Sequence, residues 1–250
     1  GLLIEVEGQK PIAIDLRSSK QFFKPYNIVK ELPEIDIEAS FNAAEALLEY
    51  KIVQAIYLMN RTVRPSIAYL VGNGEPLDYT VNDLGQSIKN QYNLGVFDLK
   101  KGFPDASKIN TLLIVKPTMP FTELDQLKID QYILSGGNVI WALDPLYAEY
   151  DSLRNTNGAY LAFDRGLGLE AQLFKYGVRV NLNLVQDLNC AKLPMVVGVD
   201  ASGAPTIQRV PWPYYPFAQA GSEHPMVQNM DRVLTAFPAS IDTVRAVGII

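Results

Sequence analysis

The sequence contains very few of the residues that carry metal or thiol chemistry. Among 250 residues it has one cysteine, Cys190, and one histidine, His224. A single cysteine excludes a disulfide within the chain and a cysteine metal cluster, and one histidine cannot complete the usual four ligands of a structural zinc site. The sequence therefore predicts no metal centre, and no pattern in it indicates a cofactor.

Positive charge is also scarce. The chain has 22 lysine and arginine residues against 27 aspartate and glutamate residues, which gives a net charge of −5. Domains with a general affinity for nucleic acid or anionic membranes present a basic stripe or patch, and no cluster of lysine and arginine occurs here. We therefore expect no nucleic acid among the partners of this chain.

Long hydrophobic runs are missing as well. No segment approaches the roughly 18 apolar residues that a membrane-spanning helix needs, and the start of the sequence does not have the pattern of a signal peptide. The sequence begins at Gly1 without an initiator methionine. We therefore expect it to be part of a longer protein, whose targeting or membrane segments lie outside these residues.

Residues 111–144 contain the clearest structural pattern. Residues 111–115 and 138–143 are apolar runs typical of strands that are buried on both faces. Thr122 and Asp125 have the spacing of a capping box that begins a helix, and Gly136-Gly137 is a signal that ends one. Strand, helix and strand with tight connections predict a parallel βαβ unit with a right-handed crossover.

Two more predicted strands complete a sheet. Residues 67–71 are apolar, whereas residues 95–99 mix polar and apolar side chains, as expected at a sheet edge. Helical spacing of Val81, Leu84 and Ile88 predicts a helix between them. The predicted fold class is α/β: a flavodoxin-like, class I glutamine-amidotransferase-like open parallel sheet with helices on both faces and strand order 2-1-3-4.

Segments on either side of this sheet extend the fold. We predict an N-terminal domain of residues 1–64, with an edge hairpin (2–6 and 11–16) and one long amphipathic helix over 40–61. Residues 65–250 form the α/β domain with a mixed C-terminal extension. In that extension we expect a helix over 169–176, a strand over 178–184, and short antiparallel pieces between 196 and 210. Prolines 211, 213 and 216 argue against a central strand there.

Ligands of open α/β sheets bind beyond the carboxyl ends of the strands, so candidate site residues are sought there. The predicted loops place Asn73, Glu75, Thr118 and Asp144 at this edge, and they suit a neutral polar ligand such as a sugar. The Gly72–Glu75 loop lacks a third glycine and a Walker lysine, and Glu75 would repel phosphate. Simple turn chemistry explains the same residues equally well.

The sequence offers no set of catalytic residues. Amidotransferase-like enzymes place a cysteine on the turn after a central strand and activate it with histidine. That turn here is Val115–Thr118, while Cys190 and His224 lie far along the chain. Some pair of carboxylates for glycoside hydrolysis stays open, but nothing singles one out. We therefore predict that the protein is not an enzyme.

A cluster of aromatic residues stands between the prolines near the C-terminus. Trp212, Tyr214, Tyr215 and Phe217 lie on this proline-stiffened segment. Such aromatics suit a contact surface for a partner protein or a sugar ring, and they equally suit a lid that folds back over the sheet. Both interpretations remain open at this stage.

Several short motifs together resemble one family, the GldG-type auxiliary proteins of gliding-motility-associated ABC transporters. In chain order they are Leu48–Lys51 with Ala55-Ile56, Tyr69–Glu75, Gly136–Trp141 with Asp144-Pro145, Lys175–Val178, Pro211–Pro216, His224-Pro225 and Ser240–Asp242. Each motif is weak alone, but their order and spacing span nearly the whole chain. One position departs from the pattern, because Asn73 stands where the family's Gly-His-Gly-Glu turn has histidine.

The resemblance implies a noncatalytic, extracytoplasmic binding or scaffolding domain on the periplasmic side of the inner membrane. It implies an anchor of transmembrane helices outside this sequence, and the permease and ATPase subunits of an ABC transporter as partners. It also implies kinship with noncatalytic amidotransferase-like domains found in intraflagellar transport proteins. Carbohydrate binding is suggested for such domains only by analogy of fold. A glycan-binding module and a hydrolase acting at the strand-end crevice are the alternative functions.

Overall fold

The computed structural model describes residues 1–5, 11–16, 36–150, 160–199, 203–219, 221, 224, 227 and 232–244. The chain divides into two compact units, Gly1–Pro65 with Ser87–Asn93, and Ser66–Gln86 with Leu94–Ile250. The predicted boundary between residues 64 and 65 stays a prediction. Each unit is described by itself below.

A short hairpin opens the first unit. Strands β1 (Leu2–Ile4) and β2 (Ile12–Ile14) pair antiparallel, so the predicted hairpin is confirmed. The two strands form a sheet of their own and do not extend a larger one, in contrast to the predicted edge position. The expected turn at Gly8 lies outside the described residues.

Two helices follow where the sequence predicted one. Helix α1 (Ile37–Ala46) begins at Asp36, whose side chain accepts a hydrogen bond from Ala39 N at 2.9 Å. Helix α2 (Leu48–Asn60) follows after Leu47, whose φ of −92° and ψ of −3° depart from helical values. The prediction of one uninterrupted helix was wrong, because the backbone at Leu47 breaks the helical geometry.

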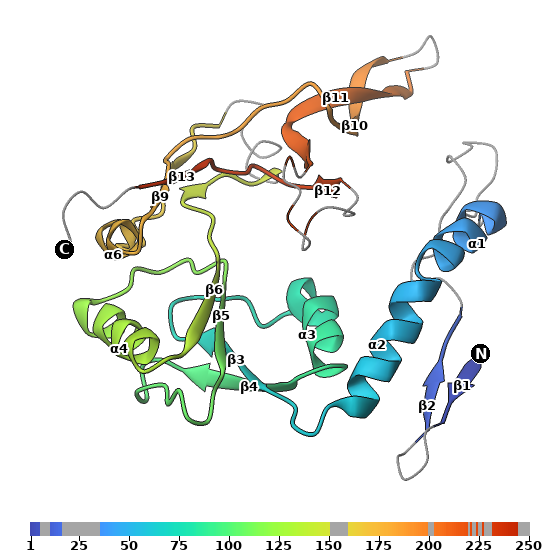
Figure 1. Ribbon diagram of the computed structural model, residues 1–250. Helices are drawn as coiled ribbons and strands as arrows, with labels where there is room; N and C mark the ends of the chain where they lie inside the picture. The colour runs from blue at the N-terminus through green and yellow to red at the C-terminus, as the bar shows by residue number, and fades with distance from the viewer. Residues whose placement is uncertain are drawn as a thin grey trace. The chain divides into compact units, whose positions relative to one another are not determined.

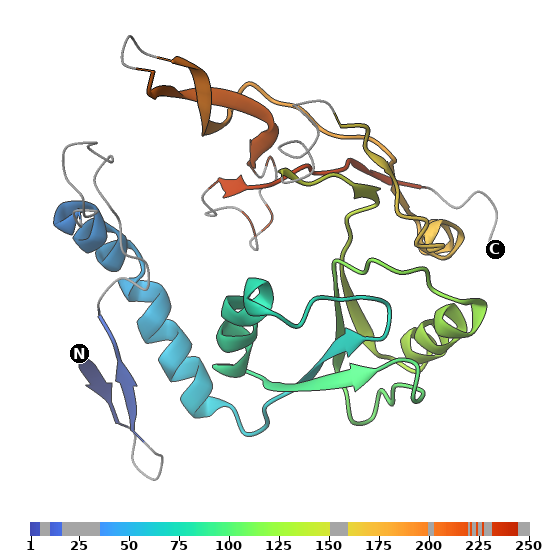
Figure 2. The same ribbon diagram turned by 180° about the vertical axis from the view of Figure 1, so that it is seen from behind.

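The second unit contains a four-stranded sheet (Figures 1 and 2). Its strands are β3 (Ser66–Val71), β4 (Asn93–Asp98), β5 (Thr111–Val115) and β6 (Asn138–Ala142), in the order β4-β3-β5-β6. Both β3 and β6 run parallel to β5. Asn93 N donates to Pro65 O, and Leu99 N donates to Val71 O. Residue numbers therefore rise in the same direction along both strands, so β4 is parallel to β3. The predicted parallel sheet and its order are confirmed.

Helices flank this sheet and supply two of its connections, from β3 to β4 and from β5 to β6. The 3₁₀ turn η1 (Tyr79–Val81) leads into α3 (Asn82–Lys89), and α4 (Glu123–Leu134) connects β5 to β6. The capping box of α4 is confirmed: Asp125 N donates to Thr122 Oγ1 at 3.2 Å, and Thr122 N donates to Asp125 Oδ2 at 2.9 Å. Both predicted helices are therefore confirmed, and the fold is mixed α/β.

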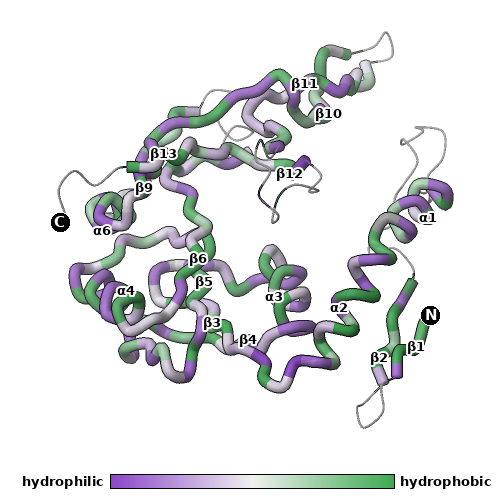
Figure 3. Tube along the Cα trace, in the orientation of Figure 1, coloured by the Kyte–Doolittle hydropathy of each residue, from purple (hydrophilic) through white to green (hydrophobic). Residues whose placement is uncertain are grey.

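The inner strand and the edge strand differ in burial. Leu112 and Ile114 on one face of β5 have no exposed surface, and Leu113 on the other face is only 6% exposed, as predicted for a strand buried on both faces. Figure 3 shows the hydrophobic residues along β3 and β5. On β6, however, burial alternates, and 53% of the Ile140 side chain is exposed. The prediction of two-sided burial was wrong for β6, because the face that carries Asn138, Ile140 and Ala142 is open to solvent and not packed against another layer of the described chain.

Tyr132 on α4 fixes the close approach of this helix to β6. Its ring is buried with 1% exposure, and its hydroxyl donates to Ile109 O at 3.0 Å. A Cβ atom on Gly137 would lie 2.2 Å from the Tyr132 ring. Gly137 therefore provides the space in which this tyrosine packs.

The C-terminal extension begins with small antiparallel pieces. Strands β7 (Leu146–Tyr147) and β8 (Phe163–Asp164) pair with each other. Helix α6 (Glu170–Lys175) ends before Gly177, whose φ is +83°, so the predicted helix and its stop are confirmed. Strand β9 (Val178–Val180) is shorter than predicted, and it pairs antiparallel with β13 (Ile241–Thr243).

A long hairpin contains the proline-rich segment. Strands β10 (Cys190–Val199) and β11 (Pro205–Ala218) pair antiparallel, and β12 (Val233–Leu234) pairs with the end of β11. The prolines do not exclude a strand here, so this prediction was wrong. The pairing of β10 with β11 has a register shift between Cys190 and Lys192. The carbonyl groups of the prolines still accept hydrogen bonds, since Asp187 N donates to Pro213 O and Thr235 N donates to Pro216 O.

Candidate functional site

Three of the four predicted ligand-binding residues meet beyond the carboxyl ends of β3 and β5. Asn73 and Glu75 follow β3, and Thr118 follows β5. The amides of Thr118 and Met119 donate to Asn73 O at 3.0 and 2.9 Å, and Thr118 Oγ1 donates to Gly74 O at 3.0 Å. These bonds hold the two strand-end loops against each other at the predicted switch point.

Asn73 and Glu75 are buried polar side chains with incomplete hydrogen bonding. Their exposures are 1% and 8%. Asn73 N donates to Glu75 Oε2 at 2.8 Å, and Asn73 Nδ2 donates to Pro120 O at 2.9 Å. Asn73 Oδ1 and Glu75 Oε1 have no donor among the described residues. Because buried acceptors without a partner are rare, this pair is the most unusual polar feature at the sheet edge.

Gly74 lets the two loops approach. Its φ is +79°, and a Cβ atom there would lie 2.1 Å from Thr118 Oγ1. Glycine is therefore required both by backbone conformation and by space. The loop geometry supports the interpretation of this segment as a tight turn, while the unpartnered oxygens leave the ligand interpretation as a prediction.

The charge of Glu75 is expected to reduce stability at neutral pH. Burial raises the pKa of the Glu75 carboxyl above its ordinary value of 4.5, and this outweighs the backbone hydrogen bonds and Lys100, which lower it. The folded state then binds the proton more tightly than the unfolded state. The free energy of unfolding should therefore fall as pH rises from about 4.5 through the raised value.

Glu75→Gln should remove this pH dependence, because the amide stays neutral and can still accept from Asn73 N. Urea unfolding between pH 4 and pH 8 should give the variant a flatter profile and at least wild-type stability at pH 8. Glu45→Gln, on an exposed side chain, is the matched control and should leave the profile unchanged. A large loss of stability in Glu75→Gln at pH 8 would show instead that the ionised carboxylate is well stabilised.

Asp144, the fourth predicted residue, belongs to a different group of charges. Its carboxylate lies 3.9 Å from Lys116 Nζ, which lies 3.1 Å from Glu149, and Arg165 Nη2 lies 3.5 Å from the same glutamate. Partial burial raises the pKa of Asp144, opposed by Lys116 and Arg165. The network joins residues that follow β5 and β6 to Glu149 and Arg165, so Asp144 is engaged mainly with charged neighbours.

The predicted aromatic contact residues pack against one another. The ring of Trp212 lies 6.4 Å from Tyr150 and 5.8 Å from Tyr214, and the rings of Tyr214 and Tyr215 lie 6.0 and 5.2 Å from Phe237. Trp212 Nε1 is buried and has no acceptor among the described residues. The cluster is built on β11 and the segment after β12. The roles of lid and contact surface stay predictions.

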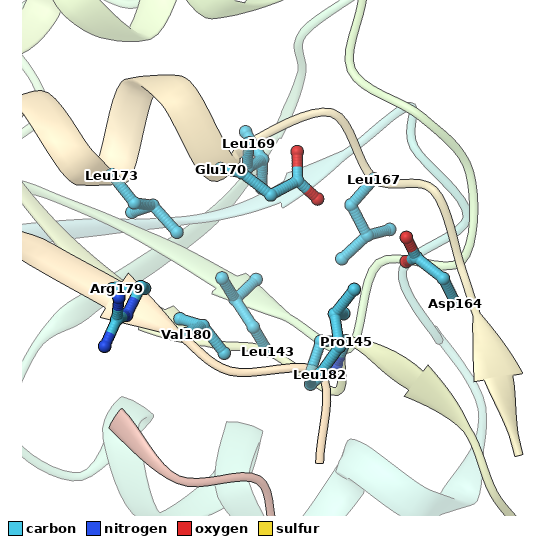
Figure 4. Close-up of a pocket in the computed structure, with 10 residues that line it drawn as sticks. All are labelled: Leu143, Pro145, Asp164, Leu167, Leu169, Glu170, Leu173, Arg179, Val180 and Leu182. Atoms are coloured by element: carbon cyan, nitrogen blue, oxygen red, sulfur yellow. The ribbon is translucent and has the colours of Figure 1, made fainter. Parts of the chain in front are cut away.

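Sequence reasoning missed two apolar cavities beside α6. The smaller cavity has a volume of about 40 Å³ and is lined by ten residues (Figure 4). They come from the segment after β6, from β8, from α6 and the loop before it, and from the segment that runs from β9 to Leu182. The larger, of about 380 Å³, shares Leu143, Leu173 and Val180 with it and adds Trp141, Tyr176, Val178, Ala239 and Ile241. The alternation of Val178 and Val180 was visible in the sequence, but it gave no sign of the partners across the cavity.

The described residues were also compared with the requirements of a metal site and of a membrane-spanning helix. No group of three or more histidine, cysteine, aspartate or glutamate residues within the described ranges is placed to hold a metal ion. Among the same residues, no helix has the length and apolarity that a membrane span requires.

Comparison with known proteins identifies one family. A family model described as an ABC-type uncharacterized transport system matches residues 64–249. No curated protein matches the chain. Among solved structures, the mmIFT52 N-terminal domain has a TM-score of 0.46 and 11% identity, over 72% of this chain and 69% of that one. Exo-beta-1,4-mannosidase Op5Man5 from Opitutaceae bacterium strain TAV5 has a TM-score of 0.29 and 12% identity, over 66% of this chain and 26% of that one.

Proposed function

The chain belongs to the ABC-type uncharacterized transport system family, and we propose that it is a noncatalytic, extracytoplasmic binding or scaffolding domain of such a system. Family membership over residues 64–249 is the observation that carries the proposal, because auxiliary proteins of transporters act through association with transporter components. The proposed partners are the permease and ATPase subunits.

The finer assignment is the GldG type, associated with gliding motility. In this assignment the domain lies on the periplasmic side of the inner membrane, anchored by helices outside this sequence. The fold is proposed to be flavodoxin-like and amidotransferase-like, and the strand order β4-β3-β5-β6 supports this. Protease added to spheroplasts of cells that make the full-length protein should degrade this domain, whereas protection until lysis would contradict the location.

The geometry of the strand-end loops supports a noncatalytic role. The hydroxyl of Thr118 donates to Gly74 O, and Glu75 Oε2 accepts from Asn73 N, so both groups hold loops together. The other Glu75 oxygen is buried away from solvent. A general base must reach its substrate within about 3 Å, which a carboxylate enclosed in this way does not offer.

Copurification tests the proposed association. Tagged full-length protein, solubilised in mild detergent from membranes of its own organism, should elute together with a permease and an ATPase subunit. The matched control is full-length protein from which residues 64–249 have been deleted, and it should retain less of both subunits. Equal recovery with and without these residues would contradict a scaffolding role for the domain.

Carbohydrate binding is a second candidate, favoured by the aromatic cluster around Trp212. Its rings suit contact with a sugar ring, and the Trp212 N–H lacks an acceptor among the described residues. Glycan-array screening should then show a saturable signal that Trp212→Ala abolishes. Trp212→Phe keeps a ring but removes the N–H, and it should weaken the signal. A signal that both variants retain would exclude this cluster as the site.

A further inference from the structure

The β9–β13 ribbon has one polar and one apolar face. Opposite residues are Val180 with Ile241, Arg179 with Asp242, and Val178 with Thr243. Arg179 Nη2 and Asp242 Oδ2 form an ion pair of 2.7 Å on one face. Since side chains alternate along a strand, Val178, Val180 and Ile241 lie on the other face, and all three line the larger cavity.

The hydrogen-bond register shows which backbone groups of β13 point away from β9. Asn181 N donates to Ser240 O at 2.9 Å, and Val244 N donates to Gly177 O at 2.8 Å. In an antiparallel pair, bonded and non-bonded positions alternate, so Asp242 is directed toward β9. The N–H and C=O groups of Ile241 and Thr243 therefore point outward. Neither residue has a bond on that side among the described residues, and both side chains are exposed.

The larger cavity lies beside this open edge. Its volume of about 380 Å³ is within the usual range for sites that take a small ligand or a large side chain. Trp141 and Leu143 come from β6 and the residue after it, Leu173 and Tyr176 from α6 and its end, and Ala239 and Ile241 from β13 and the segment before it. The Tyr176 hydroxyl is already bound to Asp130 Oδ1 at 2.6 Å, so the cavity itself offers mainly apolar contact.

We propose that the open edge of β13 and this cavity together bind an extended peptide segment of a partner protein. The backbone of the peptide pairs with the outward groups of Ile241 and Thr243, and one bulky apolar side chain enters the cavity. This is strand addition, in which main-chain bonds provide affinity and a pocket for a side chain provides specificity.

Two observations favour a peptide over a small apolar molecule. A small molecule would use the cavity but would leave the outward N–H and C=O groups of Ile241 and Thr243 without partners. In addition, Ile241 is 67% exposed although it lines the cavity, so apolar surface continues from the cavity onto the strand edge. An extended chain with an apolar side chain covers both features. The inference rests on the proposed function, because it states which kind of partner, an extended peptide segment, the binding domain recognises.

Phage-displayed random heptapeptides, selected on the purified 250-residue chain, test the proposal. The selected sequences should share one large apolar residue flanked by residues that favour strands. The best sequence, made as a synthetic peptide, should lose at least tenfold in affinity when its large residue is changed to alanine. It should lose at least as much when the amides next to that residue are N-methylated.

Matched variants of the domain locate the site. Ala239→Trp fills the cavity and should weaken peptide binding at least tenfold, whereas Ile207→Trp places the same side chain at an exposed position of β11 and should not. Because Ala239→Trp could disturb folding, amide hydrogen exchange on the wild-type chain is the second measurement. Bound peptide should slow exchange at Ile241 and Thr243, and Asp242 should be protected already in the free protein.

Several results would overturn the proposal. They are selection of no peptide above background, binding that N-methylation leaves unchanged, equal binding by Ala239→Trp, and no change in exchange at Ile241 and Thr243. Binding that is sensitive to Ala239→Trp but insensitive to N-methylation would assign the cavity to a small apolar ligand instead. The copurification experiment gives an independent result, so failure of the peptide site is distinguishable from failure of the proposed function.

Discussion

Replacing Ile114 by alanine is expected to lower the free energy of unfolding by about 3–4 kcal/mol. Ile114 lies on β5, between β3 and β6, and its side chain has no exposed surface. Truncation removes buried methyl and methylene groups and leaves a cavity that the surrounding strands cannot close, because the side chain has neighbours on every side.

Ile140→Ala on the adjacent strand is the matched control. The same chemical change is made in the same sheet, but 53% of the Ile140 side chain is exposed. Its expected loss is about 1 kcal/mol or less. Urea unfolding at a fixed pH compares the two variants. Similar losses for both would show that β5 is not the buried centre of the sheet.

Gly137→Ala is expected to destabilise the protein by about 3 kcal/mol. The added methyl group would lie 2.2–2.6 Å from three atoms of the Tyr132 ring. That ring cannot easily move away, since it is 1% exposed and its hydroxyl is bound to Ile109 O. Either α4 or the start of β6 must shift, and the core between them loses contacts.

Gly136→Ala separates this steric effect from backbone strain. Gly136 has a φ of +91°, but a Cβ atom there meets no atom within 4 Å. Its expected loss is only about 1 kcal/mol, from the conformation alone. A double variant of Gly137→Ala with Tyr132→Leu should lose less than the sum of the two single changes. Additive losses would show that Gly137 and Tyr132 do not contact each other.

The elements that the sequence predicted well are those set by neighbouring residues. The capping box of Thr122 and Asp125, the glycine stop at Gly177 and the apolar run at 111–115 are local signals, and each has the predicted structure. The sheet order follows from them, because parallel strands joined by short crossovers have few arrangements.

The errors arose where distant contacts decide the outcome. Residues 138–143 are as apolar as 111–115, yet one face of β6, with Asn138, Ile140 and Ala142, is exposed. Prolines weaken a strand because they have no N–H donor. The carbonyl oxygens of Pro213 and Pro216 nevertheless accept hydrogen bonds from Asp187 N and Thr235 N, and these bonds stabilise β11. The break at Leu47 had no local signal.

The candidate site was partly predictable. The strand-end rule correctly brought Asn73, Glu75 and Thr118 to one place, because parallel strands end on the same side. It did not separate Asp144, which pairs with Lys116, a lysine that also pairs with Glu149 farther along the chain. The cavity beside α6 was beyond prediction, since residues near 141, 176 and 240 line it together.

The prolines of β11 have a consequence for the behaviour of the protein in concentrated solution. The strand has four of them among fourteen residues, and a proline offers no N–H donor for pairing with another strand. A hairpin of this length with exposed valine and isoleucine side chains would otherwise be a site for aggregation. We therefore expect the prolines to keep β11 from seeding intermolecular sheets.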